Sequence, residues 1–435
     1  MKVGYMQSRR ILLLIFAGIT IMAVVMVVVL LRITRIEEDE LGQPVVIPTL
    51  PQQVSGANDD PLESDQHWLM PDSELINSPT AVGFDVESFI RGSYLASFEQ
   101  EYQKENFTGL AMVERTAIGH SIHPKLLLAL IEYQSGWVSA KNEAQLRHAS
   151  GIGLENSPHE GFYQELYWAA DRLAYGYYAR RVGALNSVGL RDGGMVSLPE
   201  GMNAGSAAVF YFFSLVCDTP CWAEAIEDNG FANTYLAMFG DPYDVAIEPL
   251  LPPDLQQPAM QLPFERGVIW SFTGGPHPAW GNGSAWAGLD FAPPKEVLGC
   301  VPSDEWIVAV ADGSIVRSEL GLVIQDLDGD GIEQTGWAVL YFHVATENRI
   351  AAGTKVRAGD RIGYPSCEGG FSTGTHLHIA RKYNGEWIPA DQDIPFNLDG
   401  WISSGTGSSY NGILQKNGQS VEAVDRPDEK NQIGR

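Results

Sequence analysis

The first hydrophobic feature of the chain is a run of 21 residues, 11–31, that contains no charged side chain. As an α-helix, a run of this length spans the roughly 30 Å hydrocarbon core of a bilayer. Three basic residues precede it and two follow it, so the charge bias gives little information on orientation. The length of the run, and the lack of an evident small-residue cleavage site, favour an uncleaved signal anchor over a cleaved signal peptide. We therefore expect a transmembrane helix at 11–31, a cytoplasmic stub at 1–10, and the bulk of the chain outside a cell membrane that it crosses once.

The pattern beyond the anchor predicts a spacer followed by a helical domain. Residues 36–84 are rich in Pro, Asp, Glu, Gln and Ser and show little periodicity, as in a disordered linker. From residue 85 to 245 the pattern becomes helical: Pro124–Trp137 starts with proline at a favoured first helical position. Apolar residues recur every three or four positions in 160–181 and 203–215, as in amphipathic helices.

The C-terminal part has a different pattern. Residues 246–263 form a Pro-rich linker, and short apolar runs separated by Gly and Asp follow over 264–401. Runs of this kind are typical of an antiparallel β domain. The polar residues 410–435 are expected to form a flexible tail. The fold class is thus multidomain: a transmembrane helix, an α-helical middle domain and an antiparallel all-β C-terminal domain.

Length and charge narrow the class of protein. With 435 residues, the chain is long enough for two folded domains, and 45% hydrophobic residues suffice for their cores. It carries 28 basic against 54 acidic residues, a formal charge of −26. This charge argues against binding to nucleic acid and against docking on an anionic membrane surface.

Four cysteines allow three disulfide pairings, and an extracytoplasmic location permits them to form. Their distribution between the domains suggests the pairs Cys217–Cys221 and Cys300–Cys367. A zinc site built from all four cysteines is the alternative, but the spacing of the second pair does not match a zinc ribbon.

The chemistry-bearing residues gather in the β domain. His376 and His378 are separated by one residue, so both side chains point to the same face of a strand. His277 and His343 complete the histidines of this domain. Taken singly, each has an ordinary explanation, such as a loop residue beside two prolines or a satisfied core histidine.

Their local contexts, "TGGPHPAW", "SAWAGLDFAPP", "LYFHVA" and "STGTHLHIA", are similar to a known family. Residues 264–401 resemble the lysostaphin/LytM-type zinc endopeptidases that cut peptidoglycan cross-links, and most of all their β-lytic branch. The resemblance implies one zinc ion per chain with His277, Asp290 and His378 as ligands. It implies His343 and His376 as the catalytic pair.

The chain differs at one position from the commoner family pattern, His-x-Gly-x-Asp. The corresponding positions here are Trp286-Ala-Gly-Leu-Asp290, so the first ligand of that pattern is missing. The β-lytic branch takes this histidine from further upstream, and His277 lies 13 residues before Asp290. We therefore expect a complete site.

The chemistry of the set is consistent with hydrolysis. Two imidazoles and one carboxylate leave the fourth position of zinc open for water, whose pKa the metal lowers to roughly 7. His376 is then expected to take the proton of the water and return it to the leaving amine. His343 is expected to donate a hydrogen bond to the developing oxyanion.

The middle domain resembles lysozyme-like lytic transglycosylases, in which a Glu-Ser-Gly triplet carries the general acid. Here the triplet is Gln134-Ser135-Gly136, and an amide cannot donate and recover a proton. Glu132 lies about 200° around the helix from Gln134 at about 100° per residue. We therefore expect no glycosidic cleavage; the domain holds glycan strands or is purely structural.

A last motif, Asp326–Gly331, matches the first half of a calcium-binding loop. The twelfth position, which an EF-hand fills with Glu, is Trp337, so a hairpin tip is favoured over a calcium site.

Taken together, these patterns predict a membrane-anchored extracytoplasmic zinc endopeptidase that acts on the peptides of peptidoglycan. The alternative is a catalytically inactive wall-binding protein that positions or activates another hydrolase. No motif identifies a regulatory protein partner.

Overall fold

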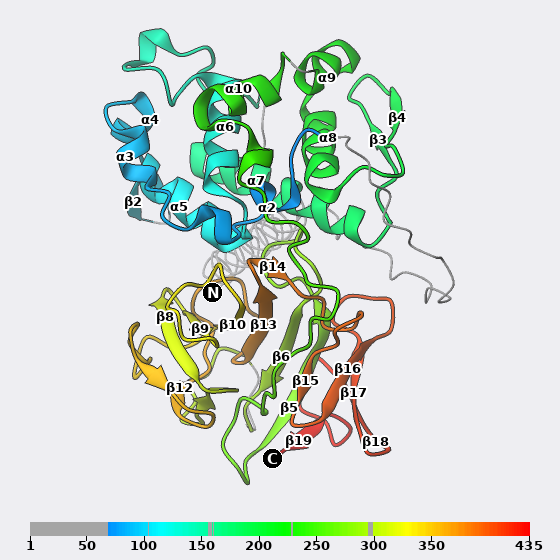
Figure 1. The fold of residues 1–435 in the computed structure, drawn as a ribbon. Helices are drawn as coiled ribbons and strands as arrows, with labels where there is room; N and C mark the ends of the chain where they lie inside the picture. The colour runs from blue at the N-terminus through cyan, green and yellow to red at the C-terminus, as the bar shows by residue number, and fades with distance from the viewer. Residues whose placement is uncertain (1–67, 103, 155–158, 160, 228, 295–298) are drawn as a thin grey trace, which may run out of the picture. The chain divides into compact units, whose positions relative to one another are not determined.

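The computed structural model describes residues 68–435 except 103, 155–158, 160, 228 and 295–298. The apolar run 11–31 and residues 36–67 of the expected spacer lie outside the described residues. Among those that are described, no helix is both long and apolar enough to span a membrane. The described residues belong to one compact unit, within which a helical lobe is followed by a β lobe (Figure 1).

The helical lobe confirms the expected α-helical middle region. The helix α6 begins at Pro124 and ends before Gly136, whose left-handed φ of 73° closes the helix. The helices are α2 Asp72–Leu75, α3 Val86–Ile90, α4 Tyr94–Ser97, α5 Gly109–His120, α6 Pro124–Ser135, α7 Phe162–Arg181, α8 Ala204–Val216, α9 Thr219–Ile226 and α10 Phe231–Phe239. Short 3-10 turns are η1 Pro79–Ala81, η2 Glu143–Gln145 and η3 Pro242–Asp244. Two hairpins pair β1 Glu99–Tyr102 with β2 Glu105–Thr108, and β3 Ser187–Gly189 with β4 Met195–Ser197.

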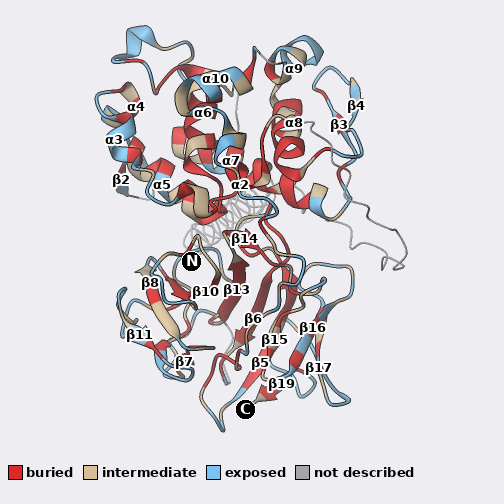
Figure 2. Ribbon diagram, in the orientation of Figure 1, coloured by how far each residue is buried: buried red, intermediate tan, exposed pale blue. Residues whose placement is uncertain are grey.

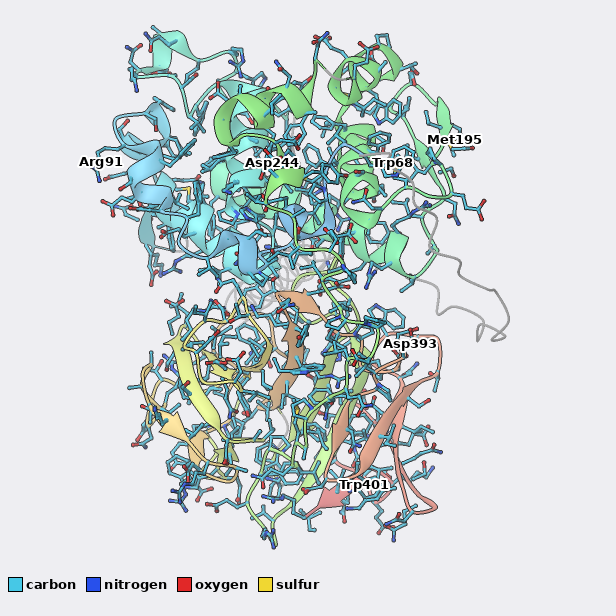
Figure 3. The ribbon with its side chains drawn as sticks, viewed as in Figure 1. Trp68, Arg91, Met195, Asp244, Asp393 and Trp401 are labelled. Atoms are coloured by element: carbon cyan, nitrogen blue, oxygen red, sulfur yellow. A yellow bond between two sulfur atoms is a disulfide. The ribbon has the colours of Figure 1, made fainter. Side chains whose placement is uncertain are left out.

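The helical lobe starts earlier than the sequence predicted. Residues 68–84 were expected in the disordered linker, yet they are ordered and pack against the lobe. The indole of Trp68 donates to the carbonyl of Gly201, 3.1 Å away (Figure 3). Met70 is fully buried, and its amide donates to Ser206 Oγ at 2.8 Å. About half of the side chains in 68–84 are apolar, and the polar composition of the residues before them hid this in the average over 36–84.

The β lobe confirms the expected antiparallel β domain. Its main sheet has nine strands, eight of them in the order β11-β8-β9-β10-β13-β6-β5-β19, with β14 paired to β13. The bounds are β5 Ile269–His277, β6 Gly288–Ala292, β8 Gly313–Glu319, β9 Leu322–Asp326, β10 Trp337–Phe342, β11 Lys355–Val356, β13 Leu377–Tyr383, β14 Glu386–Trp387 and β19 Gln432–Gly434. A four-stranded sheet contains β15 Asn397–Leu398, β16 Trp401–Gly405, β17 Gly412–Lys416 and β18 Gln419–Glu422. A two-stranded sheet pairs β7 Ile307–Val308 with β12 Arg361–Gly363.

The C-terminal residues 410–435 are not a flexible tail, contrary to the prediction. They contain β17, β18 and β19, and β19 pairs with β5 at the edge of the main sheet. Ile433 is buried, and the side-chain nitrogen of buried Asn431 lies within 3.1 Å of three backbone carbonyl oxygens. The apolar residues of this segment are few and its polar residues many, so its composition did not mark these strands in the sequence.

The burial of the tail leads to a prediction on stability. The Ile433→Ala variant is expected to lower the free energy of unfolding by about 2–5 kcal/mol, because it leaves a cavity in a packed core. The matched control is Ile402→Ala, since Ile402 is 44% exposed and its loss should cost less than about 0.5 kcal/mol. Urea unfolding of both variants measures the difference. Equal, small effects would show that the tail does not belong to the core.

The central strands of the main sheet are buried on both faces (Figure 2). Along β10, Val339 and Tyr341 contribute to the core of the β lobe, whereas Ala338 and Leu340 belong to a core shared with the helical lobe. The same division holds for β13, where Ile379 faces the first core and Ala380 faces the second. The helical lobe therefore covers one face of this sheet.

Both suggested disulfides are present, Cys217–Cys221 in the helical lobe and Cys300–Cys367 in the β lobe. Residues 327–336 join β9 to its antiparallel neighbour β10, so the acidic motif lies in a hairpin loop, as favoured from the sequence. Carboxylate oxygens of Asp326, Asp328 and Asp330 lie within 4.8 Å of one another. Calcium binding at this loop stays the less favoured alternative.

Candidate active site

Three buried side chains from three neighbouring strands converge in the β lobe. His277 ends β5, Asp290 lies in β6 and His378 lies in β13. His277 Nε2 is 2.9 Å from His378 Nδ1 and 3.3 Å from Asp290 Oδ1, and the last two atoms are 3.0 Å apart. The strand register explains the convergence, because His378 pairs directly with Asp290 on the adjacent strand. The three residues that were predicted from the sequence as metal ligands therefore form one cluster.

Backbone carbonyls fix the orientation of both imidazoles. Nδ1 of His277 lies 2.7 Å from the carbonyl of Gly275, and Nε2 of His378 lies 3.1 Å from the carbonyl of Ala279. A carbonyl oxygen can only accept, so each of these ring nitrogens carries the proton. The other nitrogen of each ring then presents its lone pair beside Asp290. This is the tautomer that metal coordination requires.

Gly288 provides the space that the two imidazoles occupy. His277 pairs with Gly288 in the β5–β6 register, two residues before Asp290 on the same strand face. A Cβ atom at this position would lie 2.3 Å from Cε1 of His378 and 3.1 Å from Nε2 of His277. The glycine is therefore required by the site rather than by the backbone.

The charges of the site suit a metal ion. Burial alone would raise the pKa of Asp290, but the electrostatic effect of the neighbouring His277 and His376 holds it well below its usual range. Burial lowers the pKa of His378, against the opposing effect of Asp290. A carboxylate and neutral imidazole are the forms in which these groups bind a divalent cation.

The expected catalytic pair lies beside this cluster. The ring centroids of His343 and His376 are 4.6 Å apart, and His376 Nε2 is 3.7 Å from Asp290 Oδ1. Nδ1 of His376 lies 2.8 Å from the carbonyl of Gly374, so it carries the proton and Nε2 is an acceptor. His343 directly follows β10 and has a left-handed φ of 63°, a conformation that is uncommon outside glycine.

The structure does not support the hydrogen-bond donor role expected for His343. Its Nδ1 lies 2.9 Å from the carbonyl of Glu368 and therefore carries the proton. Burial and the nearby His376 lower the pKa of His343 to about 3, so the ring is neutral near pH 7. Nε2 of a neutral ring with a protonated Nδ1 can only accept. His343 is thus a second acceptor beside His376.

Tyr410 is a residue of the site that sequence reasoning missed. Its ring stacks on that of His277, with centroids 4.2 Å apart and an angle of 17° between the planes. Desolvation of its hydroxyl and the charge of Asp290 raise the pKa of Tyr410 to about 12, so the hydroxyl keeps its proton at neutral pH. Because Tyr410 lies in the segment expected to be flexible, nothing in the sequence connected it to the site.

The departure at Trp286 is explained by the neighbouring strand. Trp286 is buried, and its carbonyl accepts from the amide of Ala390. Since His277 on β5 lies beside Gly288, it brings an imidazole to the cluster from across the strand pair. The site has its full set of donors although the pattern before Asp290 lacks a histidine.

In the helical lobe, Glu132 and Gln134 are directed to different partners, as their spacing predicted. Glu132 accepts from the amide and hydroxyl of Ser139, whereas Gln134 lies next to Gly153. Glu132 is therefore engaged in holding the end of α6, and it does not replace the missing acid of the triplet.

Comparisons with known proteins cover both lobes. Residues 68–253 match the N-terminal domain of LasA, and residues 285–389 match peptidase family M23. Protease LasA of Pseudomonas aeruginosa is 27% identical over 331 residues, which are 71% of this chain and 72% of LasA. The beta-lytic metalloendopeptidase of Achromobacter lyticus is 29% identical over 174 residues, 37% of this chain and 43% of that protein. Among solved structures, the M23 metalloprotease pseudoalterin is 23% identical, covers 41% of this chain and 99% of its own, and has a TM-score of 0.34.

These matches confirm the resemblance stated for the β lobe. For the helical lobe they point to the LasA N-terminal domain, and its likeness to lytic transglycosylases stays a prediction. The C-terminal lobe is a peptidase domain of family M23, and the protein is a metalloendopeptidase of this family, homologous to LasA and to the beta-lytic metalloendopeptidases.

Proposed function

We propose that the protein is a membrane-anchored extracytoplasmic zinc endopeptidase that hydrolyses peptide bonds in the stems or cross-bridges of peptidoglycan. The observation that carries the proposal is the buried cluster of His277, Asp290 and His378. Its two ring nitrogens and one carboxylate oxygen lie within 3.3 Å of one another, and both rings are held in the tautomer that binds metal.

The donor set fits zinc. Two neutral imidazoles and one carboxylate are a common protein ligand set of catalytic zinc, which keeps its fourth position for water. Zinc bound in this way lowers the pKa of a coordinated water to roughly 7 and polarises a substrate carbonyl. The lack of a side chain at Gly288 supports the proposal, because a Cβ atom there would clash with the ring of His378 and crowd that of His277.

The remaining histidines would handle the protons of the reaction. His376 presents Nε2 as an acceptor, so it can take a proton from the attacking water and deliver it to the leaving amine. His343 presents a second acceptor beside it, and its carbonyl partner keeps the ring in place. Two acceptors side by side can hold a water molecule in a defined orientation for attack.

The other parts of the chain extend the proposal. A signal anchor at 11–31 would place both lobes on the outer side of the membrane, where peptidoglycan is found. The helical lobe would hold glycan strands without cutting them, because Gln134 stands where a lysozyme-like enzyme has its acid. Binding of the full chain to purified sacculi, compared with a variant of an exposed residue on this lobe such as Met195→Ala, tests the glycan-holding role.

The test of the proposed function is made on the full chain purified in detergent. We expect one zinc ion per chain by metal analysis, and new amino termini without new reducing sugar ends after incubation with sacculi. Removal of zinc by a chelator should abolish the cleavage, and added zinc should restore it. Sacculus binding with no zinc and no new amino termini would instead favour the wall-binding alternative.

Gly288 provides a more specific prediction about the metal site. The Gly288→Ala variant is expected to bind zinc about 10–100-fold more weakly, because the new methyl group must displace the ring of His378. The matched control is Gly201→Ala, since a Cβ at Gly201 meets no atom within 4 Å. Competition with a chromogenic zinc chelator measures both affinities. Equal zinc affinities in the two variants would show that zinc binding does not require glycine at position 288.

A further inference from the structure

A short segment of the β lobe, residues 278–285, contacts both the metal-ligand cluster and the helical lobe. It connects β5, which ends at His277, to β6, which contains Asp290. At its start, the carbonyl of Ala279 accepts the hydrogen bond from Nε2 of His378. At its middle, the amides of Asn282 and Gly283 contact the helical lobe. The segment therefore connects the inner surroundings of the site to the second lobe.

The contact to the helical lobe is made by one carboxylate. Asp171 lies in α7 and is 5% exposed. Its Oδ1 accepts from the amides of Asn282 and Gly283, both at 2.8 Å, and its other oxygen pairs with Arg172. Two backbone donors on one buried carboxylate oxygen fix the path of the segment at this point.

The fit around this contact leaves no room for a shift. A Cβ atom at Gly283 would lie 1.9 Å from the carbonyl oxygen of Asp171, and one at Gly281 would lie 2.4 Å from its Oδ1. On the helical side, a Cβ atom at Gly119 would lie 2.8 Å from Nε1 of Trp280. Backbone therefore packs against backbone here, and the position of the segment follows that of α5 and α7.

The segment transmits this position to the site through its own hydrogen bonds. Ala279 donates to the carbonyl of Ala285, and Trp280 donates to Oγ of Ser284, which closes a compact loop. The ring of Trp280 packs on Phe342, with centroids 5.1 Å apart. A displacement at Asn282 and Gly283 would thus move the Ala279 carbonyl that orients His378.

We propose that Asp171 is a positioning residue for the metal site, through which the helical lobe sets the orientation of His378. The inference rests on the proposed function, because it assumes that His378 binds zinc. Without Asp171, the loop loses its fixed point and the Ala279 carbonyl is no longer held 3.1 Å from Nε2 of His378. Outer partners of this kind typically contribute 10–100-fold to metal affinity. The helical lobe then contributes to the geometry of the metal site through Asp171.

The experiment measures the zinc affinity of the full chain by competition with a chromogenic chelator, beside the visible spectrum of the cobalt-substituted protein. We expect Asp171→Ala to bind zinc about 10–100-fold more weakly and to alter the cobalt spectrum. Asp171→Asn keeps an acceptor oxygen for the two amides, so it should remain close to the parent. The matched control is Tyr178→Phe, which removes another buried hydrogen bond between the lobes, from the amide of Trp387 to the Tyr178 hydroxyl.

The outcomes separate this inference from the proposed function. If the parent protein binds no zinc, the proposed function fails. If the parent binds zinc and Asp171→Ala binds it equally well with an unchanged cobalt spectrum, the positioning role fails. Equal weakening by Asp171→Ala and Tyr178→Phe would also overturn it, because a general loosening of the lobes would then be the cause. Should Asp171→Ala not fold, Gly283→Ala displaces the same contact from the other side.

Discussion

The His277→Ala variant is expected to contain less than about one tenth of a zinc ion per chain and to lose peptidase activity. His277 supplies one of three donors to the proposed site, and no other imidazole stands at the position that the commoner family pattern assigns to the first ligand. Trp286 occupies that position and cannot coordinate a metal. A site left with one imidazole and one carboxylate has too few protein ligands for catalytic zinc.

Metal analysis of the purified full chain measures the effect, beside Asp290→Ala as a second ligand variant. The control is His148→Ala, which removes a histidine of the helical lobe and should leave the zinc content unchanged. Circular dichroism shows whether each variant is folded. A folded His277→Ala protein that retains one zinc ion per chain would exclude the upstream histidine as a ligand, and with it the proposed relation to the β-lytic pattern.

The architecture was predictable where hydrophobic periodicity is strong. The helix at Pro124–Ser135 carries its start and stop in proline and glycine, and the sequence predicted it closely. The segments 68–84 and 410–435 were misjudged because their order depends on a few apolar residues, such as Met70 and Ile433, that fill distant cores. Such contacts are set by tertiary packing, which local composition does not reveal.

The sequence analysis predicted which residues of the site carry the donor atoms for a metal ion. The alternation in a strand placed His376 and His378 on one face, and the resemblance supplied His277 and Asp290. The tautomers were not predictable, because they depend on backbone carbonyls such as that of Glu368, which fold back from another segment. For that reason, a donor role was predicted for His343 from the sequence, whereas its surroundings make it an acceptor.

The sequence also did not predict that the helical lobe packs on the metal-binding face of the main sheet. His378 lies between Leu377 and Ile379, which both face the core of the β lobe, so alternation directs His378 to the opposite face. On that face the next residue of the same row, Ala380, belongs to the core shared with the helical lobe. The metal-binding face of the sheet is thus the face that the helical lobe covers, and this is why α7 can reach the loop that orients a ligand.

The His376→Ala variant is expected to keep its zinc and to lose about two to four orders of magnitude in kcat/KM. Its Nε2 lies beside the ligand cluster but 3.7 Å from Asp290 Oδ1, and its role is to move a proton rather than to bind metal. The residue is partly exposed, so its removal should disturb the fold little. Hydrolysis of a cross-bridge peptide, followed beside metal analysis, separates the two roles.

Ser372→Ala is the matched neighbour, because Ser372 Oγ lies 3.3 Å from Nδ1 of His376 without facing the cluster. Its effect should stay below about tenfold, since the carbonyl of Gly374 still holds the ring of His376 in place. Loss of zinc in His376→Ala would make His376 a ligand, and retention of activity within tenfold would transfer the proton role to His343. A His376→Ala protein that keeps its zinc but loses kcat/KM would therefore identify His376, and not His343, as the general base.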